Sequence, residues 1–383
     1  MRPALSCRRL RGLLRTAAAL CCAAWLGGAA VLAQPAVSTD KAVPADNAVP
    51  TSKAVPADNA VPTSKAVPAV RGGQPATRPG APLTTPPSGV RMVALPVAEN
   101  TWFVQGAGAL GSVANQNFIS NAAFVIADGG VLVIDALGSP PLARQLLALI
   151  REKTPLPLRY VVATHCHADH IYGLQVFADL GARIVGHVGC RDYLHSETAR
   201  QRLIASREEL FPWIDENTRL VAPDLWMGEN GSEDDLTLRI GRNSFLVRHA
   251  GPSHTTEDLI VQDPQTGVLF AGDIVFRGRL PFVGHADSRR WIGALDRMLT
   301  LKPRLLVPGH GPLSMMPAED LQLTRDYLLY LRQTMGRAAR QMEPFEEAYA
   351  ATDWSRFSAL PLFNAANRMN AYNTYLLMEH EAP

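Results

Sequence analysis

Three histidines and one aspartate stand within six residues, directly after the apolar segment at residues 160–163. They are His165, His167, Asp169 and His170, in the order Thr-His-Cys-His-Ala-Asp-His. Buried without ligands, these side chains would carry a large desolvation cost, so ordinary core packing does not account for them. Imidazole nitrogens and carboxylate oxygens are preferred ligands of zinc and its first-row neighbours. The run therefore predicts a metal site rather than a solvated histidine-rich loop.

Three further ligand candidates follow apolar segments later in the chain. They are His254 in Gly-Pro-Ser-His-Thr, Asp273 in Val-Leu-Phe-Ala-Gly-Asp, and His310 in Pro-Gly-His-Gly. Each one alone is more often structural than functional, because short motifs recur by chance. Together with the first run they give seven ligands, which is enough for two metal ions.

The elements that must position these residues follow from hydrophobic patterning. Strands are predicted at 102–105, 121–127, 131–135, 160–164, 183–187, 236–240, 244–249, 258–262 and 267–271. Helices are predicted at about 142–152, 171–180 and from Pro317 to about 342. The order strand, helix, strand between 160 and 187 requires a parallel pair, so we expect two mixed sheets flanked by helices.

The seven residues, in this order and these contexts, resemble the metallo-β-lactamase superfamily over about residues 95–345. The resemblance implies an α/β fold, an αββα four-layer sandwich of two mixed β-sheets with metals at one sheet edge. It implies that His165, His167 and His254 hold one ion, that Asp169, His170 and His310 hold a second, and that Asp273 bridges both. Asp135, at the end of an early strand, would support the metal loop, and Asp135 and Glu257 are both candidates to orient ligand histidines.

The implied activity is that of a binuclear zinc hydrolase with two Zn²⁺ per chain. A metal-bridging hydroxide would cleave a small acyl substrate, which can be an ester, thioester, lactone or β-lactam, and Asp169 would orient it and shuttle a proton. Aspartate at 273 is similar to the thioesterase, lactonase and general-hydrolase branches. Tyr172 stands where many members have glycine and could line the substrate pocket.

Two segments, residues 267–273 and 281–289, look like those of exported quinoprotein relay system zinc metallohydrolases. That resemblance suggests a periplasmic quinoprotein dehydrogenase as a partner, and an accessory role in such a system is one alternative to hydrolysis. A mononuclear iron dioxygenase of sulfur compounds is another, since it reuses part of the first ligand set. The complete second set of ligands favours the hydrolase.

The chain of 383 residues contains three unlike segments. Residues 1–33 have five arginines and then an apolar run that ends Val-Leu-Ala, which indicates a signal peptide cleaved after Ala33 rather than an uncleaved anchor. Residues 34–90 contain the repeat KAVPADNAVPTS and 11 prolines, which indicates a disordered linker. Residues 91–383 form the expected catalytic domain.

Removing residues 1–33 leaves 32 Lys and Arg against 35 Asp and Glu, a net charge of −3. This balance argues against a nucleic-acid partner. We expect an exported protein, periplasmic or secreted, without stable membrane insertion after cleavage. The mature chain keeps two cysteines, Cys166 and Cys190, whose pairing the spacing leaves open.

Overall fold

The computed structural model describes residues 85–229, 235–284 and 286–381, all within a compact unit that spans Thr77–Pro383. The expected signal peptide and most of the expected linker lie outside these described residues. Residues 85–90 were assigned to the linker, but they contact the domain: the Gly89 amide donates to the Gln116 side chain, and Val90 accepts from Gln145. Within the described ranges, no helix is long and apolar enough to cross a bilayer.

The first sheet has seven strands in sequential order. These are β1 Leu95–Ala98, β2 Thr101–Val104, β3 Ala122–Ala127, β4 Gly130–Ile134, β5 Leu158–Val162, β6 Arg183–His187 and β7 Leu225–Met227. Pairing is antiparallel from β1 to β4 and parallel from β4 to β7. The mixed sheet predicted from the sequence is confirmed.

The second sheet has five strands in the order β12-β11-β10-β9-β8. Their bounds are β8 Asp235–Ile240, β9 Asn243–His249, β10 Leu259–Asp263, β11 Val268–Phe270 and β12 Leu305–Val307. Only the edge pair β11–β12 is parallel among them.

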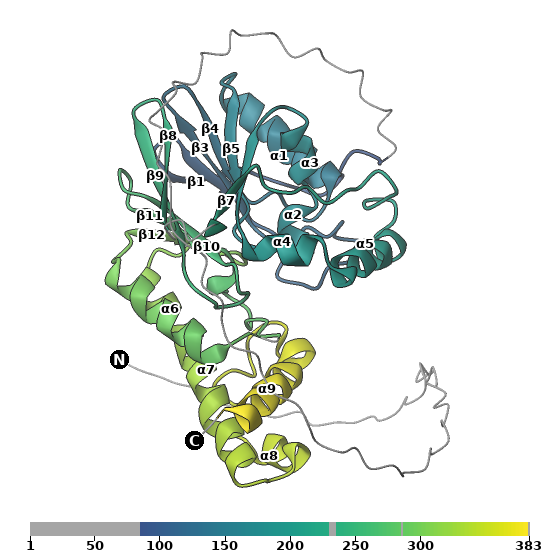
Figure 1. Cartoon of the computed structure of the whole chain (residues 1–383), viewed down its shortest axis with the longest axis vertical. Coiled ribbons are helices and arrows are strands. Elements are labelled where there is room, and N and C mark those ends of the chain that lie inside the picture. The colour runs from purple at the N-terminus through teal and green to yellow at the C-terminus, as the bar shows by residue number, and fades with distance from the viewer. Residues whose placement is uncertain (1–84, 230–234, 285, 382–383) are drawn as a thin grey trace, which may run out of the picture. The chain divides into compact units, whose positions relative to one another are not determined.

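Helices of both halves of the chain cover the outer faces of the two sheets, and α8 and α9 form a further layer on α7 (Figure 1). They are α1 Pro140–Lys153, α2 Ala168–Ile171, α3 Leu174–Ala178, α4 Gly189–Leu194, α5 Glu197–Glu209, α6 Ser288–Thr300, α7 Pro317–Arg340, α8 Phe345–Ala351 and α9 Phe363–His380, with a 3₁₀ turn at Gly272–Ile274. Helices α1, α3 and α5 pack on the first sheet and α6 and α7 pack on the second, whereas α9 packs on α7, with α8 beside both, away from the sheets (Figure 1).

Successive side chains of the central strands point to opposite faces of the sheet. One face packs against the helices, and the other packs between the two sheets. In β4, Val131 and Val133 face α1, whereas Leu132 and Ile134 pack between the two sheets against residues such as Val247. This period of two is what a strand buried on both faces requires. The αββα four-layer sandwich is thus confirmed.

The predicted helix at 171–180 is wrong in detail, because the chain forms two short helices, α2 and α3, separated at Gly173. A Cβ at Gly173 would lie 1.9 Å from the carbonyl oxygen of Ala136, so this close backbone approach admits only glycine. Helices α4 to α6, α8 and α9 were not predicted. Most of them have mixed polar sequences whose burial depends on distant partners, but α6 carries Trp291, Leu295 and Met298 at helical spacing and could have been predicted.

Candidate metal centre

The predicted ligands meet at one edge of the two sheets, on turns that follow buried strands. The run His165 to His170 leaves β5 and enters α2, with His167 at the residue before that helix. Asp273 lies in the 3₁₀ turn after β11, and His310 follows β12. His254 lies in the turn between β9 and β10. Residues up to 145 positions apart in the sequence therefore share one site.

Two groups of side chains have ligand atoms within 4.8 Å of one another. They are His165, His167, His254 and Asp273 in one group, and Asp169, His170 and His310 in the other. Asp273 joins them: Oδ2 lies 3.5 Å from His254 Nε2 and 3.2 Å from His310 Nε2. The other oxygen, Oδ1, lies 3.2 Å from His170 Nε2. His165, His167 and His254, which the resemblance assigned to one ion, fall in the first group with Asp273, and Asp169, His170 and His310 form the second.

Several buried atoms in this cluster have no hydrogen-bond partner. They are His165 Nε2, His170 Nε2 and Asp273 Oδ1. In addition, His254 Nε2 and His167 Nδ1 face each other at 2.9 Å. Because buried polar atoms are nearly always paired, this convergence of imidazole and carboxylate atoms fits metal ions such as zinc.

Two ligand histidines are oriented by hydrogen bonds on their far sides. The Nδ1–H of His170 donates to Asp135 Oδ2 at 2.9 Å, and that of His310 donates to the Ile119 carbonyl oxygen at 2.7 Å. Asp135 also accepts from the Thr164 amide and hydroxyl. Each ring therefore turns Nε2 toward the centre, which is the arrangement metal sites require. The prediction that Asp135 supports the metal-ligand loop is confirmed.

Burial and local charge set the protonation states of the cluster. Burial lowers the pKa of His254 to about 3 and that of His165 well below its usual range. Burial opposes the charged form of Asp273, but His310 and His170 outweigh it and hold the Asp273 pKa well below its usual range. At neutral pH, the His165 and His254 imidazoles are thus uncharged and Asp273 is an anion. These are the forms in which the three groups bind a metal ion.

Two glycines make room for Asp273. A Cβ at Gly309 would lie 2.0 Å from Asp273 Oδ1, and a Cβ at Gly272 would lie 2.8 Å from the Thr164 side chain. Gly272 also has a φ of +51°, a conformation that favours glycine. The glycines of the motifs Gly-Asp and Pro-Gly-His therefore allow the turns that carry Thr164, Asp273 and His310 to approach one another closely.

Two cavities open beside the cluster, with volumes of about 720 and 420 Å³. Their linings share His167, Tyr193, His254 and Phe282, so we call them the wide and narrow lobes of one cleft. Asp169, Asp273 and His310 line the narrow lobe. Burial raises the pKa of Tyr193 to about 12, so its hydroxyl stays protonated at neutral pH.

The narrow lobe also contains residues that the sequence did not single out. The ring of Phe276 stacks on His310 at 5.1 Å, and Arg279 lies beside both. Their only sequence signal is position, three and six residues after Asp273. A loop of no regular period carries them, so patterning could not find them.

Two pocket and support predictions were wrong. Tyr172 is buried in the core, where its hydroxyl lies 3.4 Å from Ser206 Oγ, and it is absent from both lobes. Glu257 contacts Thr256 and approaches Cys190 at 4.0 Å instead of orienting a ligand histidine. The side chain at 172 points into the first sheet's helical layer, because its backbone is the last turn of α2.

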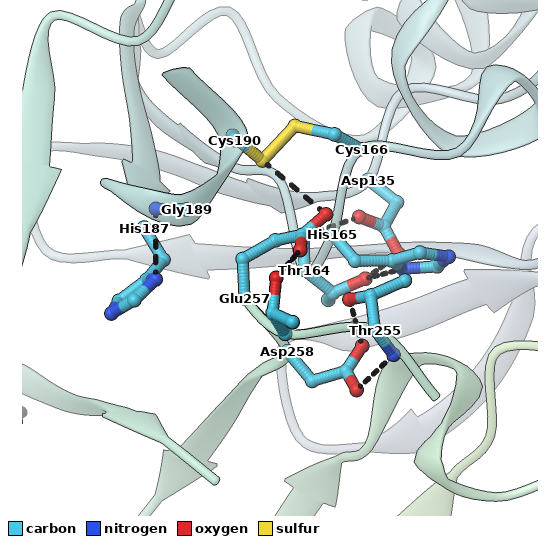
Figure 2. Close-up of a disulfide and its surroundings, with 11 residues drawn as sticks. Asp135, Thr164, His165, Cys166, His187, Gly189, Cys190, Thr255, Glu257 and Asp258 are labelled. Atoms are coloured by element: carbon cyan, nitrogen blue, oxygen red, sulfur yellow. Dashed lines mark hydrogen bonds between the residues drawn. A yellow bond between two sulfur atoms is a disulfide. The ribbon is translucent and has the colours of Figure 1, made fainter. Parts of the chain in front are cut away.

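Cys166 and Cys190 form a disulfide, which settles the pairing that spacing left open (Figure 2). The bridge joins the residue between two ligands, His165 and His167, to the first turn of α4. Figure 2 shows it above His165 and Asp135, with Glu257 alongside. The disulfide thus ties the metal-ligand loop to a helix that borders the wide lobe.

Residues 116–310 match the family described as the metallo-beta-lactamase superfamily. The chain is 24% identical over 245 residues to a linear primary-alkylsulfatase of a Pseudomonas species, covering 53% of this chain and 44% of that protein. It is 29% identical over 222 residues to the acyl-coenzyme A thioesterase MBLAC2 of Gallus gallus, covering 51% and 74%. The chain therefore spans less than half of the alkylsulfatase.

A solved structure has the same fold. The stereoselective inverting sec-alkylsulfatase Pisa1 from a Pseudomonas species aligns with a TM-score of 0.61 at 19% identity, covering 74% of this chain and 50% of that one. At this identity the likeness concerns the fold alone. Together with the family match, it confirms the architecture predicted from the sequence.

Proposed function

Because the chain belongs to the metallo-beta-lactamase superfamily, whose members named above are hydrolases, we propose that it is a binuclear zinc hydrolase of a small acyl substrate. The observation that carries the proposal is that seven potential metal ligands converge, and that several of their buried nitrogen and oxygen atoms have no hydrogen-bond partner. The substrate classes it fits are esters, thioesters, lactones and β-lactams.

Each ligand has a place in the proposal. His165, His167 and His254 would hold one ion and Asp169, His170 and His310 the other, with Asp273 shared between them. Two ions bound there would polarise a substrate oxygen and lower the pKa of a water molecule toward neutrality.

Side chains of the cleft would transfer the proton, bind the substrate and exclude water. Asp169 lines the narrow lobe, and its side chain is 17% exposed, so its carboxylate can accept a proton from the attacking water and return it to the leaving group. The Tyr193 hydroxyl, protonated at neutral pH, can donate to a substrate oxygen in either lobe. Phe276 and Phe282 would hold the apolar part of the substrate and exclude water.

The proposal includes the setting of the enzyme. Residues 1–33 would export the chain, residues 34–84 would tether the domain, and a periplasmic quinoprotein dehydrogenase would be the protein partner. The disulfide supports an oxidising compartment, where such bonds persist.

The test is metal content by elemental mass spectrometry together with hydrolysis of a thioester, a lactone, a chromogenic β-lactam and 4-nitrophenyl sulfate. We expect two zinc ions per chain and turnover that a chelator removes. Asp169→Ala should lower kcat at least about 100-fold. Asp179→Ala is the matched control, because Asp179 pairs with Arg219 on the surface. One iron per chain with oxygen consumption on a sulfur compound would instead favour the dioxygenase.

A further inference from the structure

Cys166, Cys190 and Glu257 lie together beside the wide lobe and contribute no atom to the seven-ligand cluster. Their sulfur and carboxylate oxygen atoms are within 4.8 Å of one another, and all three residues are buried. Cys166 comes from the loop after β5, Cys190 from the first turn of α4, and Glu257 from the turn between β9 and β10. A Cβ at Gly189 would lie 2.9 Å from the Cβ of Glu257, so glycine at the start of α4 allows the carboxylate to approach the disulfide.

The Glu257 carboxylate has an incomplete set of partners. Its Oε2 accepts a hydrogen bond from the Thr256 hydroxyl at 2.8 Å. Its Oε1 lies 4.0 Å from Cys190 Sγ, the contact drawn in Figure 2, but a disulfide sulfur carries no hydrogen to donate. No lysine, arginine or histidine nitrogen of the described residues lies within 4.0 Å of either oxygen. A carboxylate that is 7% exposed therefore faces two sulfur atoms without a countercharge, which is unfavourable for a buried anion.

Two other buried carboxylates of the second sheet have a donor for each oxygen. Asp258, the next residue, accepts from the Thr255 amide at 2.8 Å and from the Thr255 hydroxyl at 2.9 Å. Asp263, at the end of β10, likewise accepts from one backbone amide and one threonine hydroxyl. Buried polar atoms are nearly always paired in this way. The exposed side of the comparison is Glu257, whose Oε1 requires a partner that the disulfide form of the protein does not supply.

The geometry points to a metal ion as that partner once the disulfide is reduced. We propose that Cys166, Cys190 and Glu257 then form a third metal site, for zinc or another divalent ion that prefers sulfur ligands. A thiol reductant supplies two electrons and two protons, so the S–S bond breaks and the reductant becomes a disulfide. The ion then displaces both thiol protons, and two thiolates, one carboxylate and one water molecule complete a tetrahedral shell. Cys166 and Glu257 line the wide lobe, which gives the ion an entry path and the water molecule a place.

The third site would replace one link between segments by another. In the oxidised protein the disulfide ties the metal-ligand loop to α4, with the Cα atoms of Cys166 and Cys190 5.8 Å apart. In the reduced protein one ion would hold the same two segments, and through Glu257 it would also hold the turn that carries His254. The proposal concerns an ion additional to those of the seven-ligand cluster, so it does not depend on hydrolysis.

The test loads the protein with cobalt before and after reduction by a water-soluble phosphine, and measures metal content, free thiols and the absorption spectrum. The oxidised protein should show no thiolate-to-cobalt charge-transfer band, because the seven-ligand cluster contains no sulfur. The reduced protein should bind one more ion per chain than the oxidised protein and should show a strong charge-transfer band in the near ultraviolet. A reduced protein with two free thiols per chain, no additional ion and no such band would overturn the proposal.

Variants assign the ligands of the additional ion. Cys190→Ser should lose that ion. Glu257→Gln keeps both thiols and should weaken cobalt binding to the reduced protein at least about tenfold, the least that loss of a partner supporting a metal ligand costs. Asp192→Asn is the matched control, because Asp192 is an exposed carboxylate on the same lobe, and it should leave the affinity unchanged. Equal affinities of wild type and Glu257→Gln would overturn the role of the carboxylate.

Circular dichroism covers the case in which reduction loosens the fold. Metal binding and folding are coupled, so the proposal requires that cobalt restores the spectrum of the folded protein together with the charge-transfer band. A reduced chain that stayed unfolded in the presence of cobalt would overturn it. The oxidised protein keeps its own metal content in every arm, so failure of the third site is distinguishable from failure of the seven-ligand cluster.

Discussion

The ligand wall of the cleft is formed by turns that follow buried strands, whereas the facing wall, residues 276–284, is held from outside by α9. On the ligand wall the turns bond to one another: Gly309 donates to Gly272, and Asn121 donates to Gly309, both at 2.7 Å. On the facing wall, Asn370 of α9 accepts from the Val283 amide and donates to the Pro281 carbonyl. Asn373 donates to the Gly284 carbonyl oxygen.

The two walls also differ in their relation to the family. The match ends at residue 310, so every ligand lies inside it and α9 lies beyond it. The metal centre therefore lies within the matched segment, while the loop that carries Arg279 and Phe282 is held by α9, which lies outside that segment. Substrate preference can change on the second wall without disturbing the first.

Gly309→Ala would break the ligand wall, and we expect it to have the largest effect. The new methyl group would lie 2.0 Å from Asp273 Oδ1 and 2.6 Å from the Gly272 backbone, so the turns must separate. Zinc content should fall below two per chain and turnover should drop about 100-fold or more. Gly108→Ala is the matched control, because no atom lies within 4 Å of a Cβ there. Retention of both ions would show that the ligand wall is more compliant than its contacts indicate.

Asn370→Ala would disturb the facing wall and remove a hydrogen bond to the Tyr327 hydroxyl on α7, but it would leave the ligand wall in place. The Val283 amide and the Pro281 carbonyl would lose their partner, so residues 280–284 should shift and the fold should lose about 1–3 kcal/mol. We expect two zinc ions to remain while kcat/KM falls about tenfold. Metal analysis, steady-state kinetics and urea denaturation measure the three quantities. Asn373→Ala, which removes one bond, should have a smaller effect of the same kind, and loss of zinc in either variant would contradict the separation of the walls.

Glu381→Gln tests how far the support of α9 extends, with the smallest expected effect. Arg332 on α7 forms two bonds to Glu381 just after α9 and lowers the pKa of that carboxyl below its ordinary 4.5. The ion pair therefore stabilises the fold above about pH 4.5, and this contribution disappears as pH falls through the lowered pKa.

Because the pair is near the surface, we expect a loss of about 0.5–1 kcal/mol at pH 7 and no difference from wild type in strong acid. Urea denaturation across pH measures it. Glu379→Gln is the control, since Glu379 is exposed on the same helix. A difference that persisted in acid would assign the effect to packing.

The ligand wall could be predicted from sequence, whereas the facing wall could not. His165, Asp273 and His310 each follow an apolar strand, and the geometry of sheets brings strand ends together. Asp135 was identified through the family resemblance, as the early acidic residue at a strand end. Arg279 was not, because its position depends on contacts between residues such as Val283 and Asn370, 87 positions apart. Tyr172 was misplaced because it lies at the end of α2 with its side chain buried against Ser206 of α5.

The disulfide beside the ligands has a consequence for how the protein matures. Cys166, Cys190 and Glu257 form a third group of potential ligands, and Cys166 lies between His165 and His167 in the sequence. Thiolates bind zinc strongly, so a reduced chain would offer the ion a competing destination. Oxidation removes both sulfurs from that competition and leaves the histidines and aspartates as the preferred site. The order of oxidation and zinc binding then matters. In a chain that forms the disulfide before it binds zinc, only the histidines and aspartates are available to the ion. In a reducing environment, the two thiolates and Glu257 would compete for it.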